Sequence, residues 1–187
     1  QIDDQISISS EYRNLKKEKK YHFNRNSKKE IDEMIIYQDD ELLILNKPPG
    51  IAVQGGTKIK KSIDTLLKSS FKSLKTRLVH RLDKDTSGIL IIALNRQIAD
   101  HMSYLFREKE ITKNYWALNV GKLKIGKGTI NKEIKKKNSK TYYEALTEYN
   151  NYMKINNNLN FIIFKPITGR NHQIRIHSKE LGIPILG

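Results

Sequence analysis

The sequence contains no cysteine, and this absence excludes several kinds of chemistry. A chain of 187 residues without cysteine forms no disulfide, holds no zinc through thiolates and has no thiol nucleophile. Absence of cysteine is also typical of proteins in a reducing compartment. We therefore expect a cytoplasmic protein.

Long hydrophobic runs are lacking as well. No stretch approaches the roughly 18 consecutive apolar residues that a membrane-spanning helix needs, so we expect no membrane segment. Hydrophobic residues still make up 37% of the chain, which is sufficient for a core. The length fits one sizeable domain, or a domain with an appendage.

Acidic residues are few compared with basic ones. The chain has 35 lysines and arginines against 20 aspartates and glutamates, a formal charge of +15. Such an excess favours a polyanionic partner, most commonly RNA or DNA. Lysine, asparagine and isoleucine are used heavily throughout, so part of this charge reflects compositional bias. We take the charge as support for nucleic-acid binding, not as its proof.

The first 33 residues lack a sustained apolar period and are predicted to be a tail or linker. Within them, "NLKKEKKYHFNRNSKKE" (14–30) is strongly basic and is either an arm on a phosphate backbone or a solvated linker. We favour the linker slightly. Ordered structure is expected to begin near Met34.

From there on, apolar runs separated by turn residues predict several strands and few helices. The expected strands are 34–37, 42–45, 78–82, 89–94, 115–120, 142–149 and 160–164. The expected helices are a short one capped by Ser62, one with Ile98, Met102, Leu105 and Phe106 on one face, and one within 169–184. The basic stretch 121–140 is expected to be irregular. The fold class is therefore α+β, a mixed, mainly antiparallel sheet core with a few flanking helices.

The stretch "LVHRLDKDTSG" (78–88) places five ionisable residues between apolar runs. It is either a turn rich in salt bridges or the floor of an active site. A second cluster, "TGRNHQIRIH" (168–177), makes the site plausible. If its helix places Arg175 beside Asp83, the carboxylate is held ionised and is a ready nucleophile or base.

Three other kinds of site are disfavoured. The segment "GKLKIGKG" (121–128) lacks the Ser or Thr that a phosphate loop needs after its Gly-Lys, and a basic hairpin fits better. His172 and His177 are five residues apart, whereas zinc pairs on a helix prefer a spacing of about four. A triad of Ser87, His80 and Asp83 lacks the nucleophile elbow.

Four segments together resemble one known family. "HRLDKDTSGILIIA" (80–93) is similar, over nearly all of its length, to the signature of the RluA-type pseudouridine synthases. The family's opening hairpin is similar to "IIYQDDELLILNKPPGIAV". Its tyrosine-containing segment is similar to "FREKEITKNYWALNVG", and its closing motif to "PITGRNHQIRIHSKELGIPILG". The resemblance spans residues 34–187 in the family's order, and "IAVQGG" favours the branch that modifies large-subunit (23S) ribosomal RNA at several sites.

This resemblance implies an isomerase that converts uridine to pseudouridine in RNA with neither cofactor nor metal. It implies that Asp83 is the catalytic aspartate, that Tyr115 stacks on the target base and that Arg175 pairs with Asp83. It further implies that Arg81 fills the space left by the flipped nucleotide. Other residues expected at the substrate are His80, Thr86, Ser87, Arg170, His172 and Gln173.

The resemblance also suggests how the chain is organised. Residues 1–33 would be the linker or tail of a preceding RNA-binding domain, and 34–187 the catalytic domain, truncated at its C-terminal end. We expect a monomer whose partner is RNA, with no membrane and no small-molecule cofactor. The alternative is a non-catalytic RNA-binding or ribosome-assembly protein, which would use the basic stretches 14–30 and 132–140.

Overall fold

A computed structural model describes residues 24–56, 59, 61–71, 75–149 and 159–186. These residues form two compact units, and the domain expected over 34–187 comprises parts of both. The first unit contains the chain up to Leu78 together with Lys84–Arg96, and the second contains Val79–Asp83 and the chain from Gln97 onward. The "LVHRLDKDTSG" stretch therefore contributes to both units.

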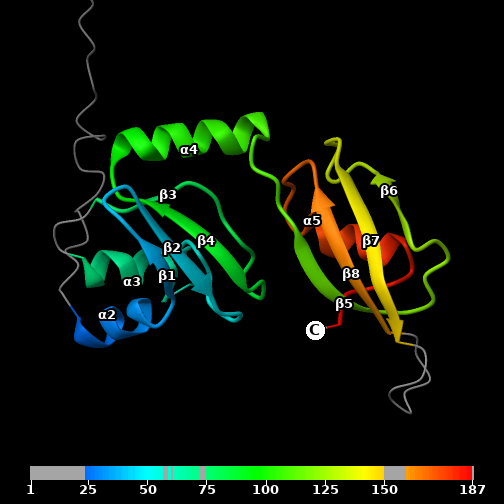
Figure 1. The fold of residues 1–187 in the computed structure, drawn as a ribbon, viewed down its shortest axis with the longest axis horizontal. Helices are drawn as coiled ribbons and strands as arrows, with labels where there is room; N and C mark the ends of the chain where they lie inside the picture. The colour runs from blue at the N-terminus through cyan, green and yellow to red at the C-terminus, as the bar shows by residue number, and fades with distance from the viewer. Residues whose placement is uncertain (1–23, 57–58, 60, 72–74, 150–158, 187) are drawn as a thin grey trace, which may run out of the picture. The chain divides into compact units, whose positions relative to one another are not determined.

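The first unit is built on a four-stranded antiparallel sheet in the order β1-β2-β4-β3 (Figure 1). Its strands are β1 Ile35–Gln38, β2 Leu42–Lys47, β3 Arg77–Leu78 and β4 Gly88–Ala93. Alternate residues of β2 point inward, and Leu43 and Leu45 are fully buried. The hairpin expected from the sequence is confirmed, since β1 and β2 pair antiparallel. Strand β2 ends at Lys47, because the next residue, Pro48, has no backbone N–H to donate to a neighbouring strand.

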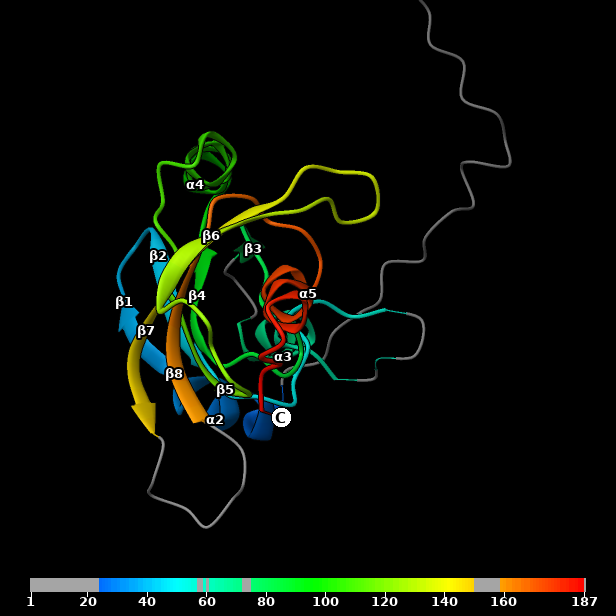
Figure 2. The same cartoon turned by 90° about the vertical axis from the view of Figure 1, so that its right-hand side faces the viewer.

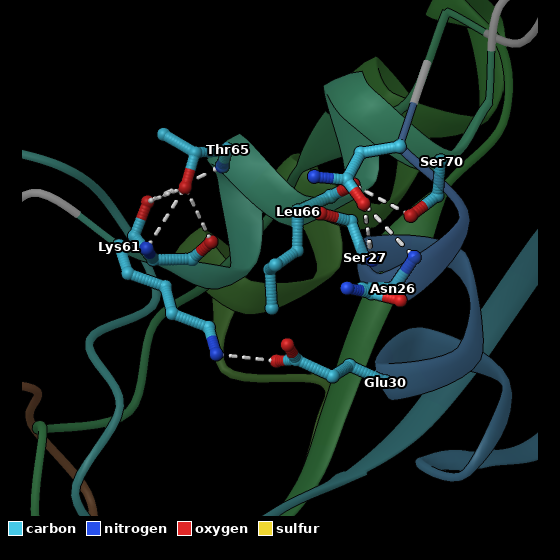
Figure 3. Close-up of polar contacts among 9 residues, drawn as sticks. Asn26, Ser27, Glu30, Lys61, Thr65, Leu66 and Ser70 are labelled. Atoms are coloured by element: carbon cyan, nitrogen blue, oxygen red, sulfur yellow. Dashed lines mark hydrogen bonds and ion pairs between the residues drawn. The ribbon is translucent and has the colours of Figure 1, made fainter.

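Two helices, α2 (Arg25–Asp32) and α3 (Ile63–Ser70), pack against each other in this unit (Figures 1 and 2). The cap predicted at Ser62 is confirmed, since its side chain and that of Thr65 hydrogen-bond reciprocally to each other's backbone N–H. Figure 3 shows this capping box together with the ion pair of Lys61 and Glu30, 2.6 Å long, which joins the start of α3 to α2.

Helix α2 corrects the expectation that order begins at Met34. The helix lies inside the predicted linker, starts at the capping side chain of Asn24 and buries Ile31 completely. A single buried residue leaves no apolar period in the sequence, so the pattern could not reveal this helix.

The second unit has its own four-stranded antiparallel sheet, ordered β5-β8-β7-β6 (Figure 1). The strands are β5 Tyr115–Val120, β6 Lys127–Asn131, β7 Lys140–Tyr149 and β8 Leu159–Pro166. Helix α5 (Gln173–Glu180) covers one face of this sheet (Figure 2), over a core that includes Ile162, Phe164 and Ile183. Gly182, with φ of +75°, ends α5 as the sequence predicted.

Two predictions about elements need correction. The stretch 121–140 is not irregular throughout, since β6 occupies 127–131 and pairs with β7 as a basic hairpin. Its signal is weak because Ile130 is the one large apolar residue of β6. The strand expected at 78–82 is reduced to Arg77–Leu78, because residues 79–83 leave the first sheet for the second unit.

The α+β fold class is confirmed, with two antiparallel sheets and flanking helices that include α4 (Arg96–Glu108). The apolar face predicted for α4 is present, and Met102 and Phe106 are half-buried along it. No helix within the described ranges is long and apolar enough to cross a membrane.

Candidate active site

Asp83 lies in the connection between β3 and β4. It is the last residue of the short segment Val79–Asp83, which belongs to the second unit. Its side chain is 27% exposed and lies 3.3 Å from the ring of His172, measured from Oδ2 to Nδ1. His172 comes from a segment about 90 residues away in the chain. Two of the predicted site residues are thus brought into direct contact.

His172 is the residue before the first turn of α5, and its backbone is left-handed, with φ 53° and ψ 25°. A residue other than glycine adopts this conformation at a cost, and such residues gather at functional sites. The imidazole is 53% exposed, so solvent and ligands reach both members of the pair.

Tyr115, the first residue of β5, lies within electrostatic reach of the same carboxylate. Burial raises the pKa of the Tyr115 hydroxyl, and the negative charge of Asp83 raises it further. The phenol therefore stays protonated at neutral pH and remains a hydrogen-bond donor. The geometry brings a carboxylate, a phenol and an imidazole together in one unit.

Arg175 does not form the predicted ion pair with Asp83. Among the described residues, the group within ion-pair distance of that carboxylate is the imidazole of His172. Arg175 lies in α5 about one helical turn beyond His172, which is a rise of about 4.5 Å along the axis. The N-cap residue of α5, rather than a residue of its first turn, contacts Asp83.

His80 packs against an aromatic ring rather than presenting a charge. Its imidazole stacks on Phe106 of α4, with ring centroids 4.5 Å apart. Burial, and then the positive charge of Lys113, lowers the pKa of His80 to about 4. It is therefore neutral at physiological pH and does not attract phosphate as a cation.

The other predicted substrate residues from this stretch lie on either side of the division between the units. Arg81 is an exposed residue of the second unit. Thr86 and Ser87 belong to the first unit, just before β4, and are half-buried and exposed respectively. For these three, a contact with substrate stays a prediction.

Two residues expected at the substrate use their polar groups inside the protein. The Arg170 guanidinium donates to the Asn138 carbonyl from Nε at 3.2 Å and from Nη2 at 3.1 Å. Gln173 is buried, and its amide hydrogen-bonds to Thr168, the Arg170 N–H, Thr141 and the Lys140 carbonyl. Both residues therefore stabilise the loop between β8 and α5.

His177 is buried, with both ring nitrogens engaged. Nδ1 lies 2.8 Å from the Thr141 hydroxyl, and Nε2 lies 3.0 Å from that of Ser139. In the parts of the chain that are described, no three His, Cys, Asp or Glu residues converge as a metal site would require. His172 instead precedes the first residue of α5, and His177 is buried within the helix.

The sequence analysis did not identify Lys47 as a buried residue. It is fully buried in the first unit, and its ammonium donates to the carbonyls of Pro48 and Ile51 at 2.9 Å and of Lys84 at 3.0 Å. The Gly50 N–H also donates to the Lys84 carbonyl, at 2.9 Å. The signal was available, because Lys47 continues the inward alternation of Leu43 and Leu45.

Comparisons with known proteins identify the family of this chain. The family model described as RNA pseudouridylate synthase matches residues 41–180. A "Ribosomal large subunit pseudouridine synthase C" of Rickettsia felis is 42% identical over 172 residues, which are 86% of this chain and 56% of that protein. One of the same name from Vibrio parahaemolyticus is 38% identical over 170 residues, 83% of this chain and 52% of that protein.

A solved structure also shares the fold. Human RNA Pseudouridylate Synthase Domain Containing 4 superposes with a TM-score of 0.70 at 27% identity, covering 85% of this chain and 69% of that one. The chain belongs to the RNA pseudouridylate synthase family, and its resemblance to the RluA type is confirmed. It spans about half the length of the curated relatives it matches.

Proposed function

We propose that this protein isomerises uridine to pseudouridine in RNA, in particular in large-subunit ribosomal RNA, with Asp83 as its catalytic carboxylate. The observation that carries the proposal is the half-buried carboxylate of Asp83, with His172 at 3.3 Å and Tyr115 within reach of its charge. Membership of the family supports the reaction type. The choice of RNA follows the names of the relatives, which refer to the ribosomal large subunit.

The reaction requires few protein groups. The N1–C1′ bond of the uridine breaks, the uracil turns, a C5–C1′ bond forms, the proton on C5 leaves and N1 becomes protonated. The Asp83 carboxylate can attack C1′, add to C6 of the uracil or remove the proton at C2′. Each route needs one ionised carboxylate beside the nucleotide, and the carboxylate of Asp83 lies 3.3 Å from the His172 imidazole.

The target base must leave its stack, which costs a few kcal/mol. Stacking on the Tyr115 ring recovers about 1–3 kcal/mol of this cost. We further propose that the phenol, which stays protonated at neutral pH, exchanges a proton with the displaced base. Arg81 occupies the space of the flipped nucleotide, and Arg175, close to the site on α5, contacts the substrate phosphate.

The test uses RNA labelled with tritium at C5 of uracil, because formation of the new bond releases that tritium. The wild-type protein should release tritium, whereas Asp83→Ala and Asp83→Asn should release none while binding RNA with unchanged affinity. Sequencing of pseudouridines in ribosomal RNA, with and without the gene, identifies the positions. Full release by Asp83→Ala would show that the assignment of the carboxylate is wrong.

Absence of tritium release from every RNA by the wild-type protein would favour the second candidate, a non-catalytic RNA-binding or ribosome-assembly protein. Its basis is the net charge of +15. In either case we propose that the protein works as a cytoplasmic monomer on RNA.

A further inference from the structure

Four buried polar side chains join α5 to the beginning of β7. Two of them, Gln173 and His177, come from the helix, and two, Ser139 and Thr141, come from the strand and the residue before it. None is more than 4% exposed. Buried polar groups are costly unless they are hydrogen-bonded, so each partner here constrains the geometry. We call these four side chains the α5 anchor.

The Thr141 hydroxyl is the centre of the anchor, because both helix residues contact it. Gln173 Nε2 donates to Thr141 Oγ1 at 2.9 Å, and His177 Nδ1 lies 2.8 Å from the same atom. Residues four apart lie on one face of a helix, one turn from each other. Two contacts one turn apart to a single strand atom fix both the rotation of α5 about its axis and its position along the strand.

The protons in the anchor follow from the partners. Ser139 donates its one proton to the Lys132 carbonyl and so accepts from His177 Nε2–H. Burial lowers the pKa of His177 and so favours the neutral imidazole. With its one proton on Nε2, Nδ1 accepts from the Thr141 hydroxyl, whose oxygen accepts from Gln173 Nε2.

The anchor continues toward the active site through the other end of the Gln173 amide. Its Oε1 accepts from the Thr168 hydroxyl at 2.7 Å and from the Arg170 N–H at 3.0 Å. Turning the amide over would set donors against donors, so its orientation is determined. The loop held in this way leads directly into His172, whose left-handed backbone needs support from its surroundings.

We propose that Thr141 and His177 are positioning residues, which hold His172 against the Asp83 carboxylate through Gln173 and helix α5. Neither touches Asp83. They act by keeping the end of α5 in register with β7, so that the imidazole stays 3.3 Å from the carboxylate. This inference rests on the proposed function for its effect on rate, but its structural part is tested separately.

The first experiment measures single-turnover pseudouridine formation by the purified protein. Thr141→Val removes the hydroxyl at nearly constant volume and should lower the rate on the order of tenfold to a hundredfold, as small displacements in active sites do. Its melting should stay cooperative and its RNA affinity unchanged. Thr141→Ser retains the hydroxyl and should restore the rate. Gln173→Met serves as a second variant if Thr141→Val does not fold.

A double-mutant cycle then separates positioning from general structural damage. In a His172→Ala background, Thr141→Val should have no further effect on the rate, because the group that it positions is gone. An unchanged rate in Thr141→Val, or a loss that simply adds to that of His172→Ala, would overturn the proposal.

The second experiment needs no activity. The ring signal of His172 in a ¹H–¹³C NMR spectrum, assigned by its loss in His172→Ala, should shift when Asp83→Asn removes the neighbouring charge. In the Thr141→Val background that shift should disappear. An equal shift in both backgrounds would overturn the inference, whether or not the wild-type protein forms pseudouridine. An inactive wild type with the expected shifts would refute only the proposed function.

Discussion

The groups close to the Asp83 carboxylate differ in how far they are buried. His172 contacts the carboxylate at the exposed side, while Tyr115 stays protonated because it is partly buried and faces the same negative charge. His80 and His177 are neutral, since burial lowers the pKa of both. His80 and His177 thus pack or hydrogen-bond inside the protein, whereas the exposed His172 contacts the carboxylate.

These neutral histidines predict a pH dependence of stability. The folded state binds their protons less readily than the unfolded chain, so the unfolding free energy falls as pH decreases from about 6.5. The loss continues to about pH 4, where His80 titrates in the folded protein. Each histidine contributes a slope of up to about 1.4 kcal/mol per pH unit.

Urea unfolding between these two pH values checks this prediction. His80→Gln should flatten the slope, whereas His101→Gln, at an exposed position of α4, should leave it unchanged. Stability that increases on acidification through this range would contradict the assignment of His80 as a neutral residue in the fold.

At the scale of elements, β2 stabilises the segment that follows Asp83. The Lys47 ammonium at the end of β2 ties the loop of Pro48 and Ile51 to the Lys84 carbonyl. A buried ammonium is costly, but the carbonyls that it satisfies would be costly as well without it. The strand, its loop and the chain beyond Asp83 are therefore joined by one side chain.

Replacing Lys47 tests how much these three hydrogen bonds stabilise the fold. Lys47→Met removes the ammonium that donates to the carbonyls of Pro48 and Ile51, and one of the two donors to the Lys84 carbonyl. It should lower the unfolding free energy by about 2 kcal/mol. Lys29→Met, at an exposed position of α2, removes the same charge and should change it by less than about 0.5 kcal/mol. Denaturation with urea measures both, and equal effects would show that Lys47 is no more than a surface charge.

Most elements were predictable from the sequence because their signals are local. The β1–β2 hairpin, the Ser62 cap and the Gly182 stop each depend on a few neighbouring residues. Helix α2 and strand β6 were not predictable, because each buries one large apolar residue and so has no period.

At the scale of the molecule, the excess of positive charge supports the proposal that the protein binds RNA. A protein of net charge +15 that neutralises phosphates releases counterions on binding, so its affinity decreases as salt increases. This attraction is independent of sequence. Under the proposed function, the site around Asp83 would then select particular uridines.

Raising monovalent salt from roughly 50 to 200 mM should weaken RNA binding by at least about tenfold. Replacing the exposed Lys165 by Gln should reduce the slope of log K against log salt if Lys165 lies on the RNA path, by about one for a single phosphate contact. Filter binding or fluorescence anisotropy measures the slope. An affinity independent of salt would contradict binding through phosphates.

The sequence by itself determined the family and the α+β class, because the order of the motifs and the spacing of apolar residues are properties of the chain alone. It also led to the proposal that Asp83 is the catalytic carboxylate. The tertiary structure alone decided which groups are partners. It places His172 rather than Arg175 on Asp83, and it buries Lys47 and Gln173 in hydrogen bonds. Hydrogen bonds and ion pairs depend on distances of a few ångströms between segments far apart in the chain, and no local pattern contains those distances.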